Sequence, residues 1–328
     1  MKNVDLRQKL YQMFILGTEG GGYKSALKNN LGGIIFFTND IFTPTQFRAL
    51  VSSCKLTSST PPFLSIDQEG GRVERTENIH NGKIYLSARD AALQGEEFVV
   101  KQTEKIAKEL NSYGINLNFA PCCDVDTNPN NPIIGERAFS SNPDEVSKFA
   151  TISAQAYRQN KIIPCAKHYP GHGDADKDSH LTLPEINMDF ETYKNLHIKP
   201  FKYLIDNDIE MIMAAHLHVP YFETEKIPTS LSKSALNYLR NDLKFNGVIV
   251  SDDMVMKGVE SFGKVQACEM GIKAGINLFI YRDSKSDKIK IIETIFDKAQ
   301  SDTELKEKIE ISYEKIMELK CKFLFQKT

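Results

Sequence analysis

Eight short apolar runs, separated by stretches with helical periodicity, constrain the fold of this 328-residue chain more than any other feature. Most of the runs are continuously apolar, as expected for parallel strands that are buried on both faces. They lie near residues 12–17, 32–37, 63–67, 115–121, 162–168, 211–216, 247–253 and 276–281. Eight strands alternating with helices predict an α/β fold, a (β/α)8 TIM barrel.

The segments between the runs are amphipathic, and residues 96–114 and 143–160 are good examples. The second segment opens on Asn142, Pro143 and Asp144, a helix start signal. A doubly wound sheet is the alternative fold, but it usually carries a Gly-rich phosphate loop, and the chain has no G-x-G-x-x-G. Without a repeat or a linker, we expect a single domain over residues 1–328. A charged C-terminal helix over residues 300–328 is expected to close the barrel.

Composition and charge exclude several classes of protein. Apolar residues make up 41% of the chain and charged residues 26%, as in globular proteins with a full core. The net charge of −2, without a basic block, argues against nucleic acid as a partner. The N-terminus does not resemble a signal peptide, and no apolar run approaches the ~20 residues that span a bilayer. The six cysteines form no C-x-x-C pair. Reduced thiols in a cytoplasmic protein are therefore expected.

Polar side chains fall where the predicted strands end. Because the carboxyl ends of barrel strands line the active site, these residues predict one shared pocket. An ionised Asp252 at the end of a buried strand is costly without partners or a task. Such a carboxylate can attack an anomeric carbon or ligate a metal, whereas its neighbour Asp253 is predicted to be a helix N-cap. The strand-end residues are Asp67, Asp124, Asp126, Lys167, His168, His216, His218, Asp252 and Asp253.

The polar segment from Lys167 to His180 has metal-like spacings that do not satisfy the rules for a metal site. Its three histidines are four and eight residues apart, but Pro170 and two glycines rule out the helix that a zinc pair of this spacing needs. Its three aspartates, together with Glu185, match positions of a calcium loop, but Ser179 stands where the turn requires glycine. We therefore expect no metal site.

A third interpretation pairs Asp178 with His180. The carboxylate can accept the ring N–H, fix the tautomer and support the imidazolium, so that the histidine serves as acid and base in turn. An exposed, unrelated pair is an equally good interpretation. Arginines at three positions can hold carboxylates ionised or bind ligand oxygens, although surface ion pairs are the alternative for each. They are Arg72, Arg75 and Arg137.

Several motifs together resemble a single family. They are KHYPGHG followed by DSH, with DQEGGRVER, IGERAF and GVIVSDDMVMKG, and they occur in the family's order. The set resembles the β-N-acetylhexosaminidases of glycoside hydrolase family 3, in particular the bacterial cytosolic NagZ type of peptidoglycan recycling. Tyr169 is a small departure from the usual Phe. The resemblance implies a (β/α)8 barrel, in agreement with the strand count.

The resemblance also implies roles for individual residues in a retaining hydrolysis through a covalent glycosyl–enzyme intermediate. Asp252 matches the nucleophile, His180 the general acid/base and Asp178 its dyad partner. The segment before His180 is expected to be a mobile loop that carries it into place. The residues that match those holding the terminal N-acetylglucosamine are Asp67, Arg75, Arg137, Lys167 and His168, with Arg72 ranked below Arg75.

The activity implied is exo-hydrolysis of N-acetylglucosamine from GlcNAc-1,6-anhydro-N-acetylmuramic acid fragments, with or without peptide. The expected partner is this carbohydrate alone: no cofactor, nucleic acid or membrane, and a monomeric cytoplasmic enzyme. Family 3 β-glucosidases are the near alternative, but they carry the acid/base on a second domain and lack the DSH loop. A metal- or sugar-binding protein that uses the Asp/His loop is the alternative from another class.

Overall fold

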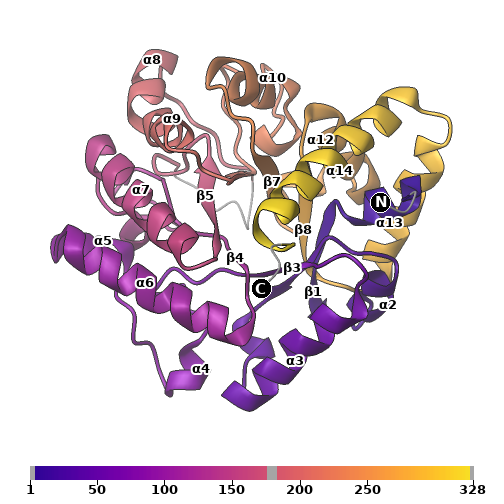
Figure 1. The fold of residues 1–328 in the computed structure, drawn as a ribbon. Helices are drawn as coiled ribbons and strands as arrows, with labels where there is room; N and C mark the ends of the chain where they lie inside the picture. Colours follow the sequence, from indigo (N-terminus) through magenta and orange to yellow (C-terminus); the bar gives the residue numbers. More distant parts are fainter. Residues whose placement is uncertain (1–3, 176–182, 326–328) are drawn as a thin grey trace.

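The strands form a closed barrel. The computed structural model describes residues 4–175 and 183–325, and within them eight parallel strands follow one another in chain order, with β8 paired to β1 (Figure 1). This arrangement confirms the predicted (β/α)8 barrel, and no strand extends more than two residues beyond its predicted run. The strands are β1 Phe14–Glu19, β2 Gly33–Phe36, β3 Phe63–Ile66, β4 Leu117–Asn118, β5 Ile163–Tyr169, β6 Met211–Ala214, β7 Val248–Asp253 and β8 Leu278–Asp283.

Helices surround the strands in Figure 1. The main helices are α1 Leu6–Tyr11, α2 Tyr23–Lys28, α3 Pro44–Thr57, α6 Glu96–Tyr113, α7 Pro143–Gln159, α9 Lys199–Asp206, α10 Lys233–Asn237, α12 Lys264–Ala274, α13 Ser286–Ala299 and α14 Thr303–Phe323. Short helices lie within the loops: α4 Glu77–His80, α5 Ala88–Leu93, α8 Phe190–Tyr193 and α11 Lys257–Glu260. Single turns of 3-10 or π type lie at Thr38–Asp40, Gly135–Arg137, Lys194–Ile198, Thr229–Leu231 and Tyr238–Asp242.

The two amphipathic segments form helices where the sequence predicts them. In α6 the buried side chains include Val99, Ile106 and Leu110, which share one helix face. The helix ends at Gly114, whose φ of 90° lies in the left-handed region that glycine adopts readily. In α7 the side chain of Asn142 caps the first turn by accepting the backbone N–H of Asp144.

The C-terminal helix α14 is shorter than the predicted range of residues 300–328. Its N-cap is Asp302, whose carboxylate accepts the N–H of Leu305, and the helix packs against α1, α12 and α13. Its last turns carry Lys320 beneath the barrel, where the ammonium donates to the carbonyl of Gly32, just before β2. The far end of α14 lies in front of the strands in Figure 1.

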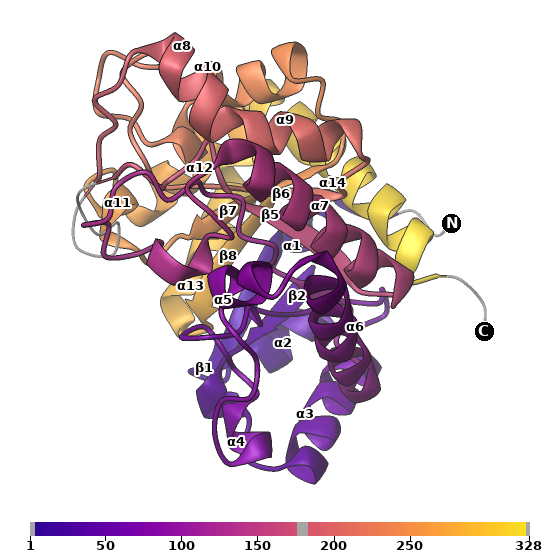
Figure 2. The same ribbon diagram turned by 90° about the vertical axis from the view of Figure 1, so that its left-hand side faces the viewer.

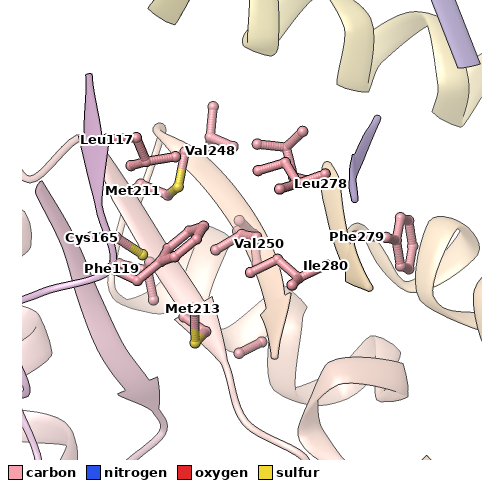
Figure 3. Close-up of a cluster of buried hydrophobic side chains, with 14 of the residues drawn as sticks. Leu117, Phe119, Cys165, Met211, Met213, Val248, Val250, Leu278, Phe279 and Ile280 are labelled. Atoms are coloured by element: carbon pink, nitrogen blue, oxygen red, sulfur yellow. The ribbon is translucent and has the colours of Figure 1, made fainter. Parts of the chain in front are cut away.

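Apolar side chains fill the barrel interior (Figure 3). Along β8, Leu278 and Ile280 face Val248 and Val250 of β7, whereas Phe279 lies on the other side of the strand. Successive side chains of a β-strand point to opposite faces. One set therefore fills the barrel interior, and the other set packs beneath the helices.

The two ends of the barrel have different surroundings. Figure 2 shows both chain termini on one side and α11, which follows β7, on the opposite side. Across residues 4–175 and 183–325, no helix combines the length and the apolar character that crossing a bilayer requires.

Candidate active site

A cavity of about 200 Å3 lies at the carboxyl ends of the strands. Six residues that the family resemblance marks as nucleophile or sugar-binding line it together, although they come from loops and strands far apart in the chain. They are Asp67, Arg75, Arg137, Lys167, His168 and Asp252. Asp178, His180 and the rest of the expected mobile loop, residues 176–182, lie outside the described residues. The roles assigned to all eight residues stay predictions.

Lys167 is the centre of a buried ion network. Its side chain is only 2% exposed, and its ammonium lies 2.8 Å from Asp67 Oδ1 and 2.6 Å from Glu69 Oε1. Burial lowers the pKa of Lys167, but the two carboxylates outweigh burial and raise it above its ordinary value. The site therefore holds a permanent positive charge close to where a ligand would bind.

Glu69 joins this lysine to Arg137. The guanidinium donates twice to the Glu69 carboxylate, from Nε at 2.9 Å and from Nη2 at 2.8 Å. Burial alone would raise the pKa of Glu69, yet Arg137 and Lys167 together hold it well below its usual range. Sequence reasoning missed Glu69, although its place two residues after Asp67 in DQEGG was a usable signal.

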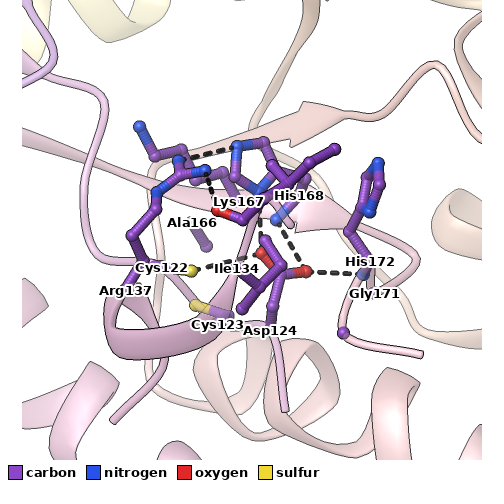
Figure 4. A network of polar contacts seen from close by, with 12 residues as sticks. Cys122, Cys123, Asp124, Ile134, Arg137, Ala166, Lys167, His168, Gly171 and His172 are labelled. Atoms are coloured by element: carbon purple, nitrogen blue, oxygen red, sulfur yellow. Dashed lines mark hydrogen bonds and ion pairs between the residues drawn. The ribbon is translucent and has the colours of Figure 1, made fainter. Parts of the chain in front are cut away.

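His168 is held by Asp124, which follows β4 (Figure 4). The ring Nδ1 lies 2.7 Å from Asp124 Oδ2, and Arg137 Nη2 lies 3.3 Å from the other ring nitrogen, Nε2. The sequence places Asp124 at a strand end but assigns it no partner. Asp126, two residues on, forms an ion pair with Arg89 at 2.5 Å and does not line the cavity.

Asp252 lies near the end of β7 and is partly exposed at the cavity. Burial would raise the pKa of its carboxyl group. The imidazoles of His168 and His216, the backbone N–H of Asp253 and the ammonium of Lys167 outweigh that effect and keep the pKa below its ordinary value. Asp252 is therefore ionised at neutral pH, as a carboxylate nucleophile must be.

Two other strand-end histidines have structural contacts. His216 is fully buried, its Nε2 lies 3.1 Å from the carbonyl of Asp253 and its Nδ1 lies 2.7 Å from the hydroxyl of Ser230. A carbonyl can only accept, so Nε2 carries the proton. His218 Nδ1 lies 3.3 Å from the carbonyl of Ile227. Neither histidine lines the cavity, contrary to the prediction that every strand-end residue shares one pocket.

Asp253 is not the predicted helix N-cap. The N-cap of α11 is Met256, three residues further on. The carboxylate of Asp253 instead forms an ion pair with Arg282 of β8 and accepts the N–H of Val255 at 3.1 Å. The prediction failed because a turn separates the end of β7 at Asp253 from the first residue of α11, Lys257.

His172 also lines the cavity, and it differs from the other histidines there. The residue is 2% exposed, and neither ring nitrogen has a hydrogen-bond partner among the described residues. Burial lowers the pKa of His172 to about 4, so the ring is neutral at physiological pH. The adjoining backbone is fixed, because Asn131 Nδ2 donates to the carbonyl of His172 at 2.8 Å and Tyr193 donates to that of Gly171 at 2.8 Å.

A second hollow of about 310 Å3 adjoins the cavity. The two share Phe37, Arg75 and Arg282 in their walls, and the second is completed by residues that end β1 or follow β2. Arg75 lies over the ring of Phe37, and its Nε has no hydrogen-bond partner in the described part of the chain. Arg72, by contrast, donates to the backbone carbonyls of residues 132–134 and supports the loop beside the site.

One set of buried side chains in the described ranges contains atoms of the kinds that bind metal ions. Cys122, Asp124 and His168 offer ligand atoms within 4.8 Å of one another. Burial, with Asp124 beside it, raises the pKa of the Cys122 thiol well above its ordinary value, and the protonated thiol donates to Asp124 at 3.2 Å. Because these atoms already bond one another, the set is a hydrogen-bond network.

Comparison with known proteins gives consistent results. The family profile described as "Glycosyl hydrolase family 3 N terminal domain" matches residues 5–319. Beta-hexosaminidase A of Pseudoalteromonas piscicida is 34% identical over an alignment of 276 residues, and the match covers 76% of this chain but only 45% of that protein. The Beta-hexosaminidase of Idiomarina loihiensis is 30% identical over 271 residues and 80% of each chain.

A solved structure, a glycoside hydrolase family 3 beta-N-acetylglucosaminidase from Paenibacillus sp. str. FPU-7, superimposes with a TM-score of 0.91 at 27% identity. The match covers 99% of this chain and 64% of that one. This chain therefore spans less than two thirds of two of these three relatives.

Proposed function

This chain belongs to glycosyl hydrolase family 3, and we propose that it is a retaining, exo-acting β-N-acetylglucosaminidase, that is, a β-N-acetylhexosaminidase. The observation that carries the proposal is the cavity in which an ionised carboxylate, Asp252, faces a set of fixed polar groups. The relatives named beta-hexosaminidase support the substrate class.

The proposed reaction has two steps. Asp252 attacks the anomeric carbon and forms a covalent glycosyl ester while the leaving oxygen takes a proton from His180. Water, deprotonated by His180, then attacks the same carbon and releases the sugar and the Asp252 carboxylate. Asp178 supports the imidazolium form of His180. These last two roles rest on the sequence, because both residues lie outside the described ranges.

The polar groups opposite Asp252 are proposed to bind the terminal sugar. Asp67, Lys167 and His168 come from β5 and the end of β3, and Arg75 and Arg137 approach from loops. Sugar hydroxyls both donate and accept hydrogen bonds, so a mixture of carboxylate, ammonium, guanidinium and imidazole groups suits them.

The proposed substrate is the peptidoglycan fragment GlcNAc-1,6-anhydro-N-acetylmuramic acid, with or without peptide, and the proposed place of the reaction is the cytoplasm. Four of the proposed sugar-binding groups lie away from the adjoining hollow, whereas Arg75 lines both, so the leaving group is proposed to extend past Arg75 and Arg282 into that hollow. The enzyme is proposed to act as a monomer without nucleic acid or membrane partners.

The proposal is tested with a chromogenic β-N-acetylglucosaminide and a fluorinated N-acetylglucosamine mechanism probe. We expect turnover that survives a metal chelator, and covalent labelling of Asp252 detected by mass spectrometry of peptides. Turnover of the β-glucoside but not the β-N-acetylglucosaminide would favour the other branch of the family. Lack of turnover of both substrates from acid to neutral pH would refute the proposed hydrolase activity.

Variants separate the two chemical roles. Asp252→Ala removes the nucleophile and should lower kcat by on the order of 10⁴-fold or more. His180→Ala should slow substrates with poor leaving groups far more than those with good ones, because only the former need protonation. Equal losses on both substrates would contradict the acid/base assignment.

A further inference from the structure

We propose that Asp124 is a positioning residue that sets the tautomer of His168 and the location of His172, two histidines of the cavity. The proposal rests on the proposed function for its kinetic consequences, but its structural part concerns the free protein. The sequence places Asp124 at a strand end, and no role follows from that placement.

The carboxylate of Asp124 is fully buried and receives donors at both oxygens. Its Oδ2 accepts from His168 Nδ1 at 2.7 Å and from the thiol of Cys122 at 3.2 Å. Its Oδ1 accepts the backbone N–H of His172 at 2.6 Å and, at 3.4 Å, that of His168 (Figure 4). Burial would raise the pKa of Asp124, but His168 and His172 hold it well below its usual range. One anion therefore orients a ring and fixes a backbone segment.

The contacts of His168 determine its protonation pattern. A guanidinium can only donate, so the 3.3 Å contact with Arg137 requires an unprotonated Nε2. The proton then lies on Nδ1, where Asp124 accepts it. The ring is thus a neutral Nδ1–H tautomer, and its Nε2 lone pair serves as the acceptor at the cavity.

This tautomer identifies the kind of group that His168 recognises. A 3.3 Å bond to Arg137 is long, and Arg137 already donates twice to Glu69. A hydroxyl group in the cavity can replace Arg137 as the partner of this nitrogen by donating its proton to Nε2. An ether or fluorine substituent can accept but cannot donate, so we infer that His168 selects for a sugar hydroxyl.

The second arm of Asp124 acts on His172. The 2.6 Å bond to its backbone N–H holds the chain where the neutral, unpartnered ring lines the cavity. Asp124 therefore controls the placement of both imidazoles, one through its side chain and the other through its backbone.

The variant Asp124→Asn tests this arrangement because neither orientation of the amide satisfies it. If the amide NH2 takes the position of Oδ1, it faces the backbone N–H of His172, so that two donors meet and no hydrogen bond forms. With NH2 at Oδ2, His168 must accept at Nδ1 and move its proton to Nε2, where it faces Arg137. The matched control is Asp126→Asn, which removes a neighbouring carboxylate that pairs with Arg89 and does not line the cavity.

The first measurement needs no substrate, and its readout comes from the wild-type protein, with a variant used only to assign the signal of His168. Nitrogen-15 NMR of the imidazole groups in the free wild-type protein, assigned with His168→Gln, should show His168 protonated at Nδ1 only. A proton at Nε2 would overturn the proposal, whatever the enzyme hydrolyses.

The second measurement uses kinetics. On a chromogenic β-N-acetylglucosaminide we expect KM of Asp124→Asn to rise about 10- to 100-fold, the range for a lost charge-assisted hydrogen bond. Asp126→Asn should stay within about twofold of wild type, the size expected for a partly exposed ion pair. In the His168→Gln background the KM effect of Asp124→Asn should shrink, because the two residues act through the same contact. Additive effects would contradict the proposal.

The third measurement uses substrate analogues deoxygenated or fluorinated at positions 3, 4 or 6 of the sugar. One position should lose at least about tenfold in kcat/KM in wild type, by both replacements, because both remove a donor. The same replacement should cost much less in Asp124→Asn. If fluorine restored wild-type activity, the hydroxyl would not be donating to His168.

Discussion

Two buried lysines lie at opposite ends of the barrel, and their partners differ. Lys167, at the carboxyl end, contacts the carboxylates of Asp67 and Glu69. Lys320, at the amino end, is also fully buried, but its ammonium donates to the amide oxygen of Gln12 at 2.7 Å and to a backbone carbonyl at 2.9 Å. Within residues 4–175 and 183–325, no carboxylate pairs with Lys320.

The two pKa values move in opposite directions for this reason. At Lys167 the carboxylates overcome burial and raise the pKa, whereas at Lys320 burial lowers the pKa well below its ordinary value. Burial of a charge therefore does not by itself mark a functional site. The carboxyl end differs because two carboxylates balance the buried charge of Lys167. They keep the lysine protonated over the whole physiological pH range.

Replacing each lysine by methionine should give the largest difference between the two ends. Lys167→Met removes a charged donor from the proposed sugar site and leaves two carboxylates less compensated, so kcat/KM should fall by at least about 100-fold. Lys320→Met, far from the cavity, should keep kcat/KM within about threefold. Steady-state kinetics on a chromogenic β-N-acetylglucosaminide measure kcat/KM of both variants. Comparable losses would contradict the proposed difference between the two lysines.

The variant Glu69→Gln tests whether the pairing of buried charges also stabilises the carboxyl end of the barrel. The substitution keeps the shape but leaves Arg137 and Lys167 sharing one fewer buried anion, and removing one partner of a buried pair costs about 3–5 kcal/mol. Urea unfolding measures the change, with the exposed Glu97→Gln as control. A loss below about 1 kcal/mol would mean that water replaces the carboxylate at little cost.

At alkaline pH the two lysines should affect the free energy of unfolding in opposite directions. Because the pKa of Lys320 is lowered, the unfolded chain binds a proton there that the folded chain lacks, and stability rises with pH until about 10.4. Lys167, with a raised pKa, is protonated in both states below about 10.4 and loses its contribution only above that pH. As pH rises towards about 10.4, wild type should gain up to about 1.4 kcal/mol per pH unit relative to Lys320→Met. Parallel pH profiles in urea unfolding would contradict the lowered pKa.

An exposed ion pair provides the smallest effect in the comparison. Lys101 lies 2.5 Å from Glu97 on the surface of α6, where solvent screens both charges. Lys101→Ala should change the free energy of unfolding by only about 0.3–0.5 kcal/mol, with no change in kcat/KM. A larger effect would show that the distinction between buried and exposed lysines is weaker than proposed.

The barrel could be predicted from the sequence because its signals are local. Continuous apolar runs mark strands buried on both faces, and the start at Asn142 and the stop at Gly114 are decided by neighbouring residues. Prediction failed at Asp253, because its carboxylate pairs with Arg282 of β8, a contact between distant residues that the local sequence does not encode.

The residues that face the cavity were easier to predict than the residues that hold them. Asp67, Lys167 and Asp252 stand out because polar side chains interrupt apolar runs. Glu69 and Asp124 act through partners about 100 and 44 positions away, and such pairings exist only once the barrel has closed. Their charges were visible in the sequence, but their geometry was not.

The pairing of β8 with β1 has a consequence for synthesis of the protein. Ile280 and Arg282 of β8 form part of the cavity wall, so a nascent chain that has made β7 already carries Asp252 but has no complete site. It also has two strand edges without partners, the kind of surface that associates with other chains. Thirty residues separate Asp253 from Asp283, and at about 5–20 residues per second this interval lasts roughly 2–6 s. Each molecule thus exposes strand edges that can associate with other chains until β8 pairs with β1 and closes the ring.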